Sequence, residues 1–223
     1  MRGLFVTGTD TGVGKTILAA AICAALAERG ERVAAFKPVV TGLDDPPGDW
    51  PHDHELLASV ANAGQSPNDV APARFGPPVS PHHAAELAGT TLEPLDLARA
   101  ARAAADGADA LVCEGVGGLM VPLTTGYLVR DFALDLDLAL VVAARPGLGT
   151  INHTLLTVEA ARTAGLDVRA IVLTPWAREP SDLERSNRET IASLADLEVA
   201  TLPHARPDAL ADVGRALPLE EWL

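Results

Sequence analysis

One short stretch near the N-terminus constrains the fold of this chain more than any other feature. Small residues and a lysine fill Gly8–Thr16, between the apolar run Leu4–Val6 and an alanine-rich segment that begins at Ile17. This order is typical of a strand, a phosphate-binding turn and a helix, because small residues let backbone N–H groups surround a phosphate tail. Lys15 then reaches the outer phosphates and the Thr16 hydroxyl ligates magnesium. The stretch predicts a nucleoside triphosphate site and says nothing about the reaction.

The turn departs from the strict form of its motif at one position. Counting back from Gly14, the pattern G-x-x-x-x-G-K-[ST] requires glycine where this chain has Thr9, and the available glycine is Gly8. The alternative interpretation is a glycine-rich turn in which Lys15 and Thr16 follow by chance. The strand before the turn and the helix after it favour the nucleotide site, because the motif binds phosphate in this context.

Composition limits the class of protein. The length of 223 residues and the hydrophobic content of 48% fit one domain, residues 1–223, with a sizeable core around a single sheet. The net charge of −13 excludes nucleic acid or an anionic membrane as partner, since the 17 lysines and arginines are scattered. Cys23 and Cys113 lack metal or redox spacing. With no secretory signal and no apolar run near the ~18 residues of a membrane helix, we expect a cytoplasmic protein.

Apolar strands alternate with helical segments along the chain. We expect strands at residues 4–7, 33–40, 110–113, 138–143, 168–173 and 199–202. We expect helices at residues 15–29, 53–60, 94–105, 128–134, 150–165 and 181–194. This alternation predicts an α/β fold with a P-loop NTPase-like parallel sheet, flanked by helices on both faces.

Local signals mark where some of these elements begin and end. Thr150 is a suitable N-cap for one helix, and Ser181 with Glu184 forms a capping box at the start of another. The proline- and glycine-rich stretch through Pro81 is expected to be ordered loop, and the residues after Leu202 an irregular tail.

Several chemically active side chains follow the predicted strands. Lys15 and Lys37 are the only lysines of the chain, and Pro38 ends the second strand beside Lys37. Because the carboxyl ends of parallel strands meet at one edge, Lys15, Lys37, Glu114 and Thr41 are expected to share one crevice. For Lys37 the alternative is a side chain that extends to the surface, and for Thr41 it is a turn residue.

Two carboxylates are candidates for a magnesium site with Thr16. Glu114 ends a predicted strand, and the glycine-rich loop Gly115–Gly118 beside it lets a ligand approach the backbone closely. Asp53 opens a predicted helix, so metal binding and simple helix capping remain equal alternatives for it. The helix that begins at Thr150 has free N–H groups suited to a carboxylate, although an ordinary capped helix explains the same pattern.

Five motifs together resemble the dethiobiotin synthetase family over residues 1 to about 190. They are Gly8–Thr16, Lys37-Pro38-Val39 with Thr41-Gly42, Ser80-Pro81-His82, Glu114–Gly118, and Gly149-Thr150-Ile151-Asn152-His153. The early glycine of the phosphate turn is a feature that the family shares. His82 and His83 have no metal partners at a recognisable spacing, and we expect both to be loop histidines.

The resemblance implies an ATP- and magnesium-dependent ligase of biotin biosynthesis that works as a homodimer. Such enzymes carboxylate 7,8-diaminopelargonate with carbon dioxide and close a cyclic urea, through a carbamate and a carbamic-phosphoric anhydride. By this resemblance Lys15 and Lys37 are catalytic, and Thr16, Asp53 and Glu114 ligate the metal. Thr41 is implied to contact the diamine.

The resemblance also implies two larger sets of binding residues. The set implied to bind ATP is Gly12, Val13, Gly14, Lys15, Thr16, Ile17, Asp53, Glu114, Gly115, Val116, Gly117, Thr174, Pro175, Pro203, His204 and Ala205. The set implied to receive the substrate carboxylate, contributed by the partner subunit, is Gly149, Thr150, Ile151 and Asn152. The chain departs from the family pattern at Val116, commonly alanine, and at Thr174-Pro175-Trp176, where many relatives have asparagine.

Two other classes share a similar phosphate turn. ATP-driven switches of the partitioning and cell-division type carry a signature lysine early in the turn, where this chain has Asp10. The synthetase module of cobyrinate-type amidotransferases precedes a glutaminase domain, which we do not expect in a chain that stops at Leu223. The ligase is therefore the preferred hypothesis.

Overall fold

Six parallel strands form the central sheet, as predicted. The computed structural model describes residues 1–223 and arranges these strands in the order β10-β9-β8-β1-β5-β2. Their bounds are β1 Gly3–Gly8, β2 Val33–Phe36, β5 Ala110–Glu114, β8 Ala139–Ala144, β9 Val168–Trp176 and β10 Glu198–Pro203. Since β1 pairs with β8 on one side and β5 on the other, the loops that follow these strands diverge around a crevice at their carboxyl ends.

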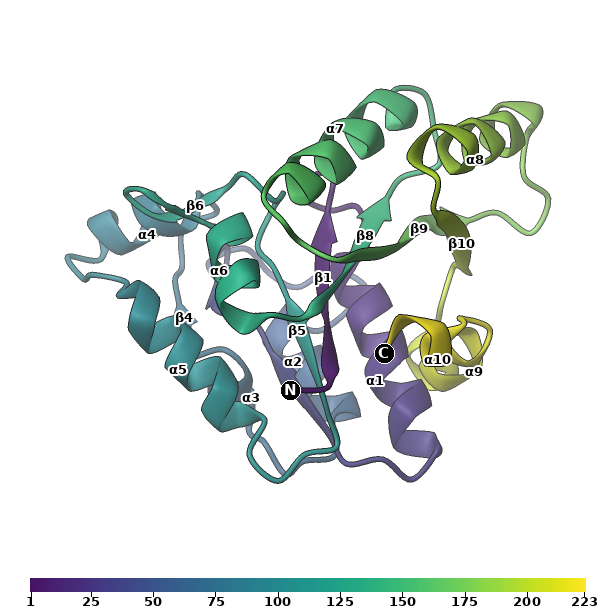
Figure 1. Cartoon of the computed structure of the whole chain (residues 1–223). Coiled ribbons are helices and arrows are strands. Elements are labelled where there is room, and N and C mark those ends of the chain that lie inside the picture. The colour runs from purple at the N-terminus through teal and green to yellow at the C-terminus, as the bar shows by residue number, and fades with distance from the viewer.

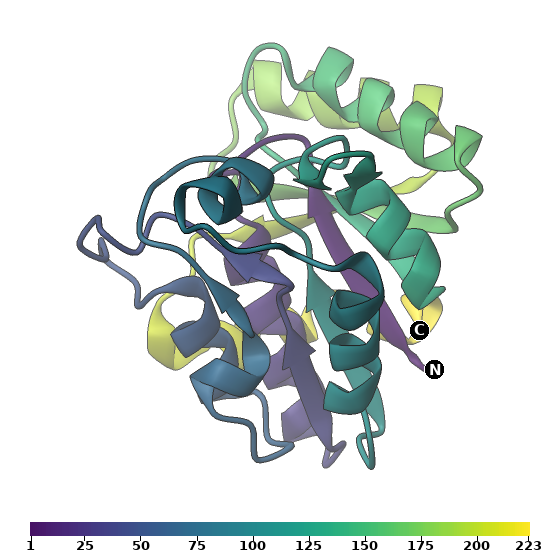
Figure 2. The same ribbon diagram turned by 90° about the vertical axis from the view of Figure 1, so that its left-hand side faces the viewer.

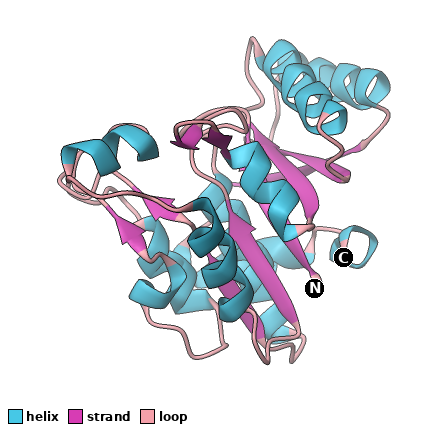
Figure 3. Ribbon diagram, turned by 60° about the vertical axis from the view of Figure 1, so that its left-hand side comes forward, coloured by secondary structure: helices cyan, strands magenta, loops and turns pink.

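Helices cover both faces of the sheet (Figures 1 and 2). The longer helices are α1 Lys15–Glu28, α2 Asp53–Val60, α5 Pro94–Ala104, α6 Val129–Leu136, α7 Thr150–Thr163 and α8 Asp182–Ala195. The shorter ones are α3 Pro67–Val70, α4 Pro81–Leu87, α9 Leu210–Arg215 and α10 Leu219–Trp222, with a 3-10 turn at Pro207–Ala209. No helix combines the length and the apolar character that crossing a bilayer requires. The predicted α/β class is confirmed, with helix and strand layers distinguished in Figure 3.

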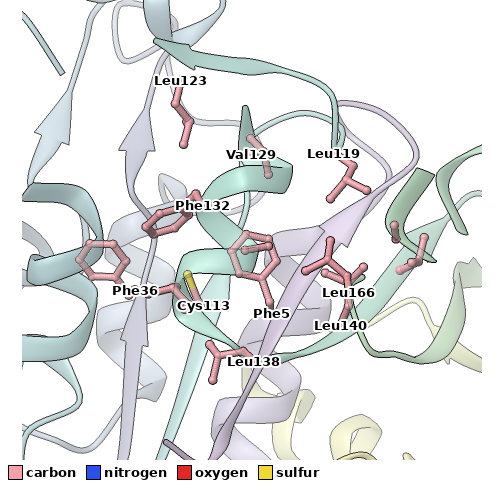
Figure 4. Packing of buried hydrophobic residues seen from close by; sticks show 14 of the residues in the cluster. Phe5, Phe36, Cys113, Leu119, Leu123, Val129, Phe132, Leu138, Leu140 and Leu166 are labelled. Carbon is pink, nitrogen blue, oxygen red and sulfur yellow. The ribbon is translucent and has the colours of Figure 1, made fainter. Parts of the chain in front are cut away.

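Successive residues of β1 point to opposite faces and enter two separate cores. Leu4 and Val6 belong to a core that includes residues of α1, α2, α9 and α10, whereas Phe5 belongs to a core that includes residues of α5, α6, α7 and α8. Phe132 of α6 lies edge to face with Phe5, with ring centroids 5.9 Å apart, and 6.4 Å from Phe36 of β2 (Figure 4). Strands buried on both faces explain why the sequence shows continuous apolar runs there.

The second strand is shorter than predicted. β2 ends at Phe36, and Val39–Val40 form a separate strand, β3, which pairs with β4 (Ala73–Arg74) in a small sheet of its own. Pro38 has no N–H to donate to a ladder, which accounts for the break. Lys37 lies at this break, and its backbone N–H donates to Val70 O at 2.9 Å.

Two segments predicted to be irregular are ordered into short elements. The stretch before Pro81 contains α3 and β4, and α4 begins at Pro81, so the prediction that His82 and His83 are loop histidines is wrong. Proline suits the first turn of a helix, and Ser80 precedes it at the N-cap position. A hairpin of β6 (Pro122–Thr124) and β7 (Tyr127–Leu128) was also not predicted.

The C-terminal segment is helical rather than an irregular tail. α9 and α10 lie beside α1 in Figure 1, and Trp222 and Leu219 are almost completely buried in the core on that face. The helices α1 and α9 approach closely at Gly214, where an added Cβ atom would lie 2.1 Å from Ala21 O. Only a residue without a side chain permits this packing.

We therefore expect Gly214→Ala to destabilise the protein, although alanine normally favours a helix over glycine by about 1 kcal/mol. The clash with the α1 backbone forces the two helices apart, at a cost of about 1–3 kcal/mol in the free energy of unfolding. Urea unfolding measures the change. Gly48→Ala is the matched control, because an added Cβ atom there meets no heavy atom within 4 Å. Equal stability of Gly214→Ala and the wild type would contradict this packing.

Candidate active site

The phosphate turn joins β1 to α1 as the sequence predicts. Gly12 and Gly14 have φ angles of 70° and 97°, which side-chain-bearing residues rarely adopt. Lys15 folds back over the turn, and its Nζ donates to Asp10 O at 2.7 Å. The first N–H groups of α1 have no acceptor within the helix, so the turn and the helix start form an anion site.

Both lysines of the chain are buried at this edge of the sheet. Lys15 is 6% exposed and Lys37 is 4% exposed. Burial lowers the pKa of Lys15 to about 8, with Glu114 acting in the opposite direction. Burial also acts to lower the pKa of Lys37, but the carboxylates of Glu114 and Asp53 outweigh it and raise that pKa above its ordinary value.

Lys37 connects two carboxylates that come from distant parts of the chain. Its Nζ donates to Glu114 Oε1 at 2.6 Å and to Asp53 Oδ2. Glu114 stands at the end of β5, next to β2, whereas Asp53 is the first residue of α2. Burial raises the pKa of Glu114, and Lys37 offsets this only in part. For Asp53 the attraction of Lys37 outweighs burial and lowers the pKa.

Three oxygen-bearing side chains here suit a hard cation. Thr16 Oγ1 donates to Glu114 Oε1 at 2.9 Å, and Asp53 reaches the same cluster through Lys37. Glu114 Oε2 is buried and has no hydrogen-bond partner. An unpaired buried carboxylate oxygen is costly unless a cation or donor meets it, and carboxylate and hydroxyl oxygens are ligands that Mg²⁺ accepts. The donor set thus fits a magnesium ion.

A cavity of about 710 Å³ opens beside this cluster. The residues from the predicted sets that line it are Gly12, Gly14, Lys15, Thr16, Ile17, Lys37, Thr41, Asp53, Glu114, Val116 and Gly117. Other lining residues were not predicted, among them Asp45, Trp50, Pro51, Pro78, Val79 and Val121. They come from the proline-rich loops and from the turn before β6. The composition of these segments indicates connections but does not indicate which side chains face the cavity.

The remaining predicted nucleotide residues lie outside this cavity. Val13 is buried beneath the turn, and Gly115 faces Phe5 and Val129. Thr174 lies directly beside the turn, because a Cβ atom on Gly14 would be 2.9 Å from its Cγ2.

The last part of the predicted nucleotide set lies at the ends of two adjacent strands. Pro175 follows Thr174 through a cis peptide bond, and Pro203 of β10 pairs with Trp176 of β9. Pro203, His204 and Ala205 therefore come close to Thr174 and Pro175 at the same edge of the sheet.

The predicted carboxylate site starts α7, away from the cavity. Gly149, with a φ of 90°, occupies the N-cap position, so the prediction that Thr150 is the N-cap is wrong. The Thr150 hydroxyl lies instead 3.3 Å from the Thr154 hydroxyl within the helix. Asn152 is exposed.

The loop before α7 is fixed by a residue that sequence reasoning missed. Asn187 of α8 is 4% exposed, and its Nδ2 donates to Pro146 O at 2.9 Å and to Gly147 O at 3.1 Å. In the sequence, Asn187 is one polar residue among many in this helix. Only its place on the core-facing side of the helix could have indicated that it is buried.

Comparison with known proteins agrees with this geometry. A sequence-family model described as "AAA domain" matches residues 2–206. The ATP-dependent dethiobiotin synthetase of Anaeromyxobacter dehalogenans strain 2CP-1 is 42% identical over 208 residues, 93% of this chain and 92% of the relative. This chain belongs to the dethiobiotin synthetase family. Relatives of the same name in Bacillus licheniformis and Bacillus subtilis strain 168 are 39% and 35% identical, over 86% and 89% of this chain and 80% and 85% of their own lengths.

Dethiobiotin synthetases are ligases, and family membership makes this chain an enzyme of that class. The solved structure of Cyanthece apo McdA resembles the chain in fold, with a TM-score of 0.56 over 99% of this chain and 92% of that one. At 12% sequence identity this likeness shows the fold alone.

Proposed function

We propose that the protein carboxylates 7,8-diaminopelargonate with carbon dioxide and closes the ring with ATP, giving dethiobiotin, ADP and phosphate. One observation carries the proposal: Lys37 and Lys15 are buried at the mouth of the phosphate turn, beside the carboxylates Glu114 and Asp53, in a chain that belongs to this family. Buried fixed cations of this kind stabilise anions that form during a reaction.

The reaction divides into three balanced steps. One substrate amine attacks carbon dioxide and loses a proton, which leaves a carbamate. A carbamate oxygen then attacks the γ-phosphorus of ATP, releasing ADP and forming the carbamic-phosphoric anhydride. The second amine attacks the carbonyl carbon of the anhydride and loses a proton, and phosphate leaves as the cyclic urea closes. Each step places negative charge on oxygens close to the phosphate turn.

Lys15 and Lys37 stabilise these anions. Lys15 is the first residue of α1, and its side chain meets the outer phosphates. The N–H groups of Gly12–Ile17 surround the phosphate tail. Lys37 lines the same cavity beside Thr41, whose hydroxyl contacts the diamine. A guanidinium is larger and planar, so arginine does not reproduce the compact charge of either lysine.

Thr16, Asp53 and Glu114 would hold the magnesium ion. When bound, the ion neutralises phosphate charge and orients the transferring group. Glu114 Oε2, which has no protein partner, supports this assignment. The base of the nucleotide would be held by residues at the ends of β9 and β10, namely Thr174, Pro175, Pro203, His204 and Ala205. Gly115, Val116 and Gly117 close the nucleotide site from the β5 side.

A homodimer completes the substrate site. Gly149–Asn152 do not line the cavity of their own chain, so the helix start that they form serves the substrate carboxylate of the partner subunit. Leu148, immediately before this segment, is 91% exposed.

Labelled bicarbonate tests the proposed reaction. Incubation with the diamine, Mg-ATP and ¹⁴C-bicarbonate should give acid-stable label and ADP in equal amounts, and omission of either the diamine or ATP should abolish the label. A free carbamate loses its label in acid, so only ring closure gives this result. ATP hydrolysis that proceeds at the same rate without the diamine contradicts the proposal and favours an ATP-driven switch.

Asn187→Ala tests the role of the helix start at Gly149–Asn152. The change leaves the carbonyls of Pro146 and Gly147 without their donor, which should reduce the free energy of unfolding by about 1–3 kcal/mol. The loosened loop should raise the KM for the diamine and leave the KM for ATP unchanged. Ser186→Ala, on the exposed side of the same helix, is the control. An unchanged KM for the diamine in folded Asn187→Ala would argue against this placement of the substrate carboxylate.

A further inference from the structure

One carboxylate oxygen carries two hydrogen bonds while its neighbour carries none. Glu114 Oε1 accepts from Lys37 Nζ at 2.6 Å and from Thr16 Oγ1 at 2.9 Å, whereas Oε2 has no partner. The same ammonium also bonds to Asp53 Oδ2. All three proposed metal ligands therefore meet at or beside the Nζ atom of one lysine.

A divalent cation that takes the free Oε2 of Glu114 together with Thr16 and Asp53 lies close to the Lys37 ammonium, which holds Oε1 of the same carboxylate. Thr16 Oγ1 contacts Glu114 through Oε1, the oxygen that Lys37 holds, so a cation bound to both Thr16 and Glu114 approaches the ammonium closely. Glu114 is fully covered and Lys37 is 4% exposed, whereas the Asp53 side chain is 42% exposed, so solvent screens the repulsion between the two positive charges only in part. The two carboxylates can balance the charge of one of these cations but not the charge of both.

We propose that Lys37 and the divalent cation exclude each other at Asp53 and Glu114, so that cation binding releases the Lys37 ammonium into the active-site cavity. This inference rests on the metal ligands of the proposed function. Lys37 thereby has two positions: it neutralises the carboxylates until the cation binds, and it then meets the carbamate and the phosphoryl group.

The surrounding structure permits this movement of the side chain alone. The backbone N–H of Lys37 is fixed to Val70 O at 2.9 Å, and the residue lies at the break between β2 and β3. Its side chain already lines the cavity together with Lys15 and Thr41, so no wall separates the two positions. Lys15 differs, because its Nζ donates to Asp10 O and to no carboxylate.

Mn²⁺ affinity tests the exclusion directly. Electron paramagnetic resonance of free Mn²⁺ measures binding to the full-length protein without nucleotide. Removal of the competing charge in Lys37→Met should tighten Mn²⁺ binding by about tenfold or more, since the cation no longer displaces an ammonium. The control Lys15→Met should change the affinity much less. Equal or weaker Mn²⁺ binding by folded Lys37→Met overturns the proposal, and so does an absence of Mn²⁺ binding in every form.

A measurement on the wild-type protein avoids any dependence on the folding of a variant. Because the chain has only two lysines, protein labelled with ¹⁵N at lysine Nζ gives two side-chain ammonium signals. Saturation with MgCl₂, judged by displacement of bound Mn²⁺, should move the Lys37 signal and speed its proton exchange, with a smaller change for Lys15. An unchanged Lys37 signal at saturation overturns the proposal.

The two proposals fail in different ways. If the wild type fixes labelled bicarbonate in a diamine-dependent way but Lys37→Met binds Mn²⁺ with unaltered affinity, only the mutual exclusion of Lys37 and the cation is contradicted. If the variant binds Mn²⁺ more tightly but the wild type fixes no bicarbonate, only the proposed carboxylation and ring closure are contradicted.

Discussion

Lys37→Met is expected to reduce kcat for ring closure about 10²–10³-fold, the effect of removing one fixed charge-stabilising group from an active site. The methionine side chain has a similar volume and no charge, so the cavity keeps its shape while the anions lose their cation. The KM for ATP should change little, because Lys15 and the N–H groups of the phosphate turn still bind the nucleotide. Steady-state rates of ADP release in the presence of the diamine and bicarbonate measure the loss.

The same substitution also removes the partner of a buried carboxylate. Glu114 is completely buried and keeps the hydrogen bond from Thr16 Oγ1 in Lys37→Met, but it loses the nearby ammonium, so we expect the variant to fold with a lower free energy of unfolding than the wild type. Circular dichroism checks that the variant is folded. Lys37→Arg is the control that keeps the charge but not its compact form, and it should remain well below wild-type activity. An unchanged kcat in folded Lys37→Met would exclude Lys37 from the chemistry.

The parts of the fold that the sequence predicts well depend on local signals. The phosphate turn follows from its own glycines, and the Ser181–Glu184 capping box forms as expected, with Glu184 N–H donating to Ser181 Oγ at 3.3 Å. The six apolar runs of the central sheet are found as strands because burial on both faces removes polar residues from them. Only their ends shift, most clearly at Phe36.

The parts that the sequence predicts poorly depend on contacts with distant residues. The C-terminal helices α9 and α10 are short and show no strong hydrophobic periodicity. Their formation depends on packing against α1, which α9 approaches most closely at Gly214. The pair β3 and β4 consists of two residues in each strand, too few to show alternation. The helix α4 was hidden by the prolines around it, although Pro81 is itself suited to a helix start.

Within the site, the sheet topology made the proximity of Lys37 and Glu114 predictable, but it did not indicate which residues form the walls of the cavity. Glu114 ends β5 and Lys37 follows directly after β2, and the parallel arrangement places these two strands next to each other, so their proximity follows from the fold class. Asp53 does not cap its helix, because His52 occupies the N-cap position of α2, and the contact with Lys37 places Asp53 at the cluster. Trp50 lines the cavity from a loop whose path no local pattern specifies.

The core beneath the site determines where these strand ends lie. Phe132 of α6 is completely buried between Phe5 and Phe36, the aromatic residues of β1 and β2. Phe5 also lies beneath Gly115, since a Cβ atom there would be 3.1 Å from Phe5 Cε1. One aromatic cluster therefore supports the strand before the phosphate turn, the strand before Lys37 and the loop after Glu114.

Phe132→Ala should lower the free energy of unfolding by about 3–5 kcal/mol, since it removes a buried ring and leaves a cavity that the surrounding strands fill only in part. Leu134→Ala is the matched control on the same helix, because Leu134 is 39% exposed and its truncation should change stability by less than about 0.5 kcal/mol. Urea unfolding of both variants gives the comparison. If Phe132→Ala were no less stable than Leu134→Ala, the ring cluster would not be the support of the three site-bearing segments. A large loss of stability accompanied by a raised KM for ATP would show that the positions of Lys37 and Glu114 depend on this packing, because the ring touches neither the nucleotide site nor the cavity.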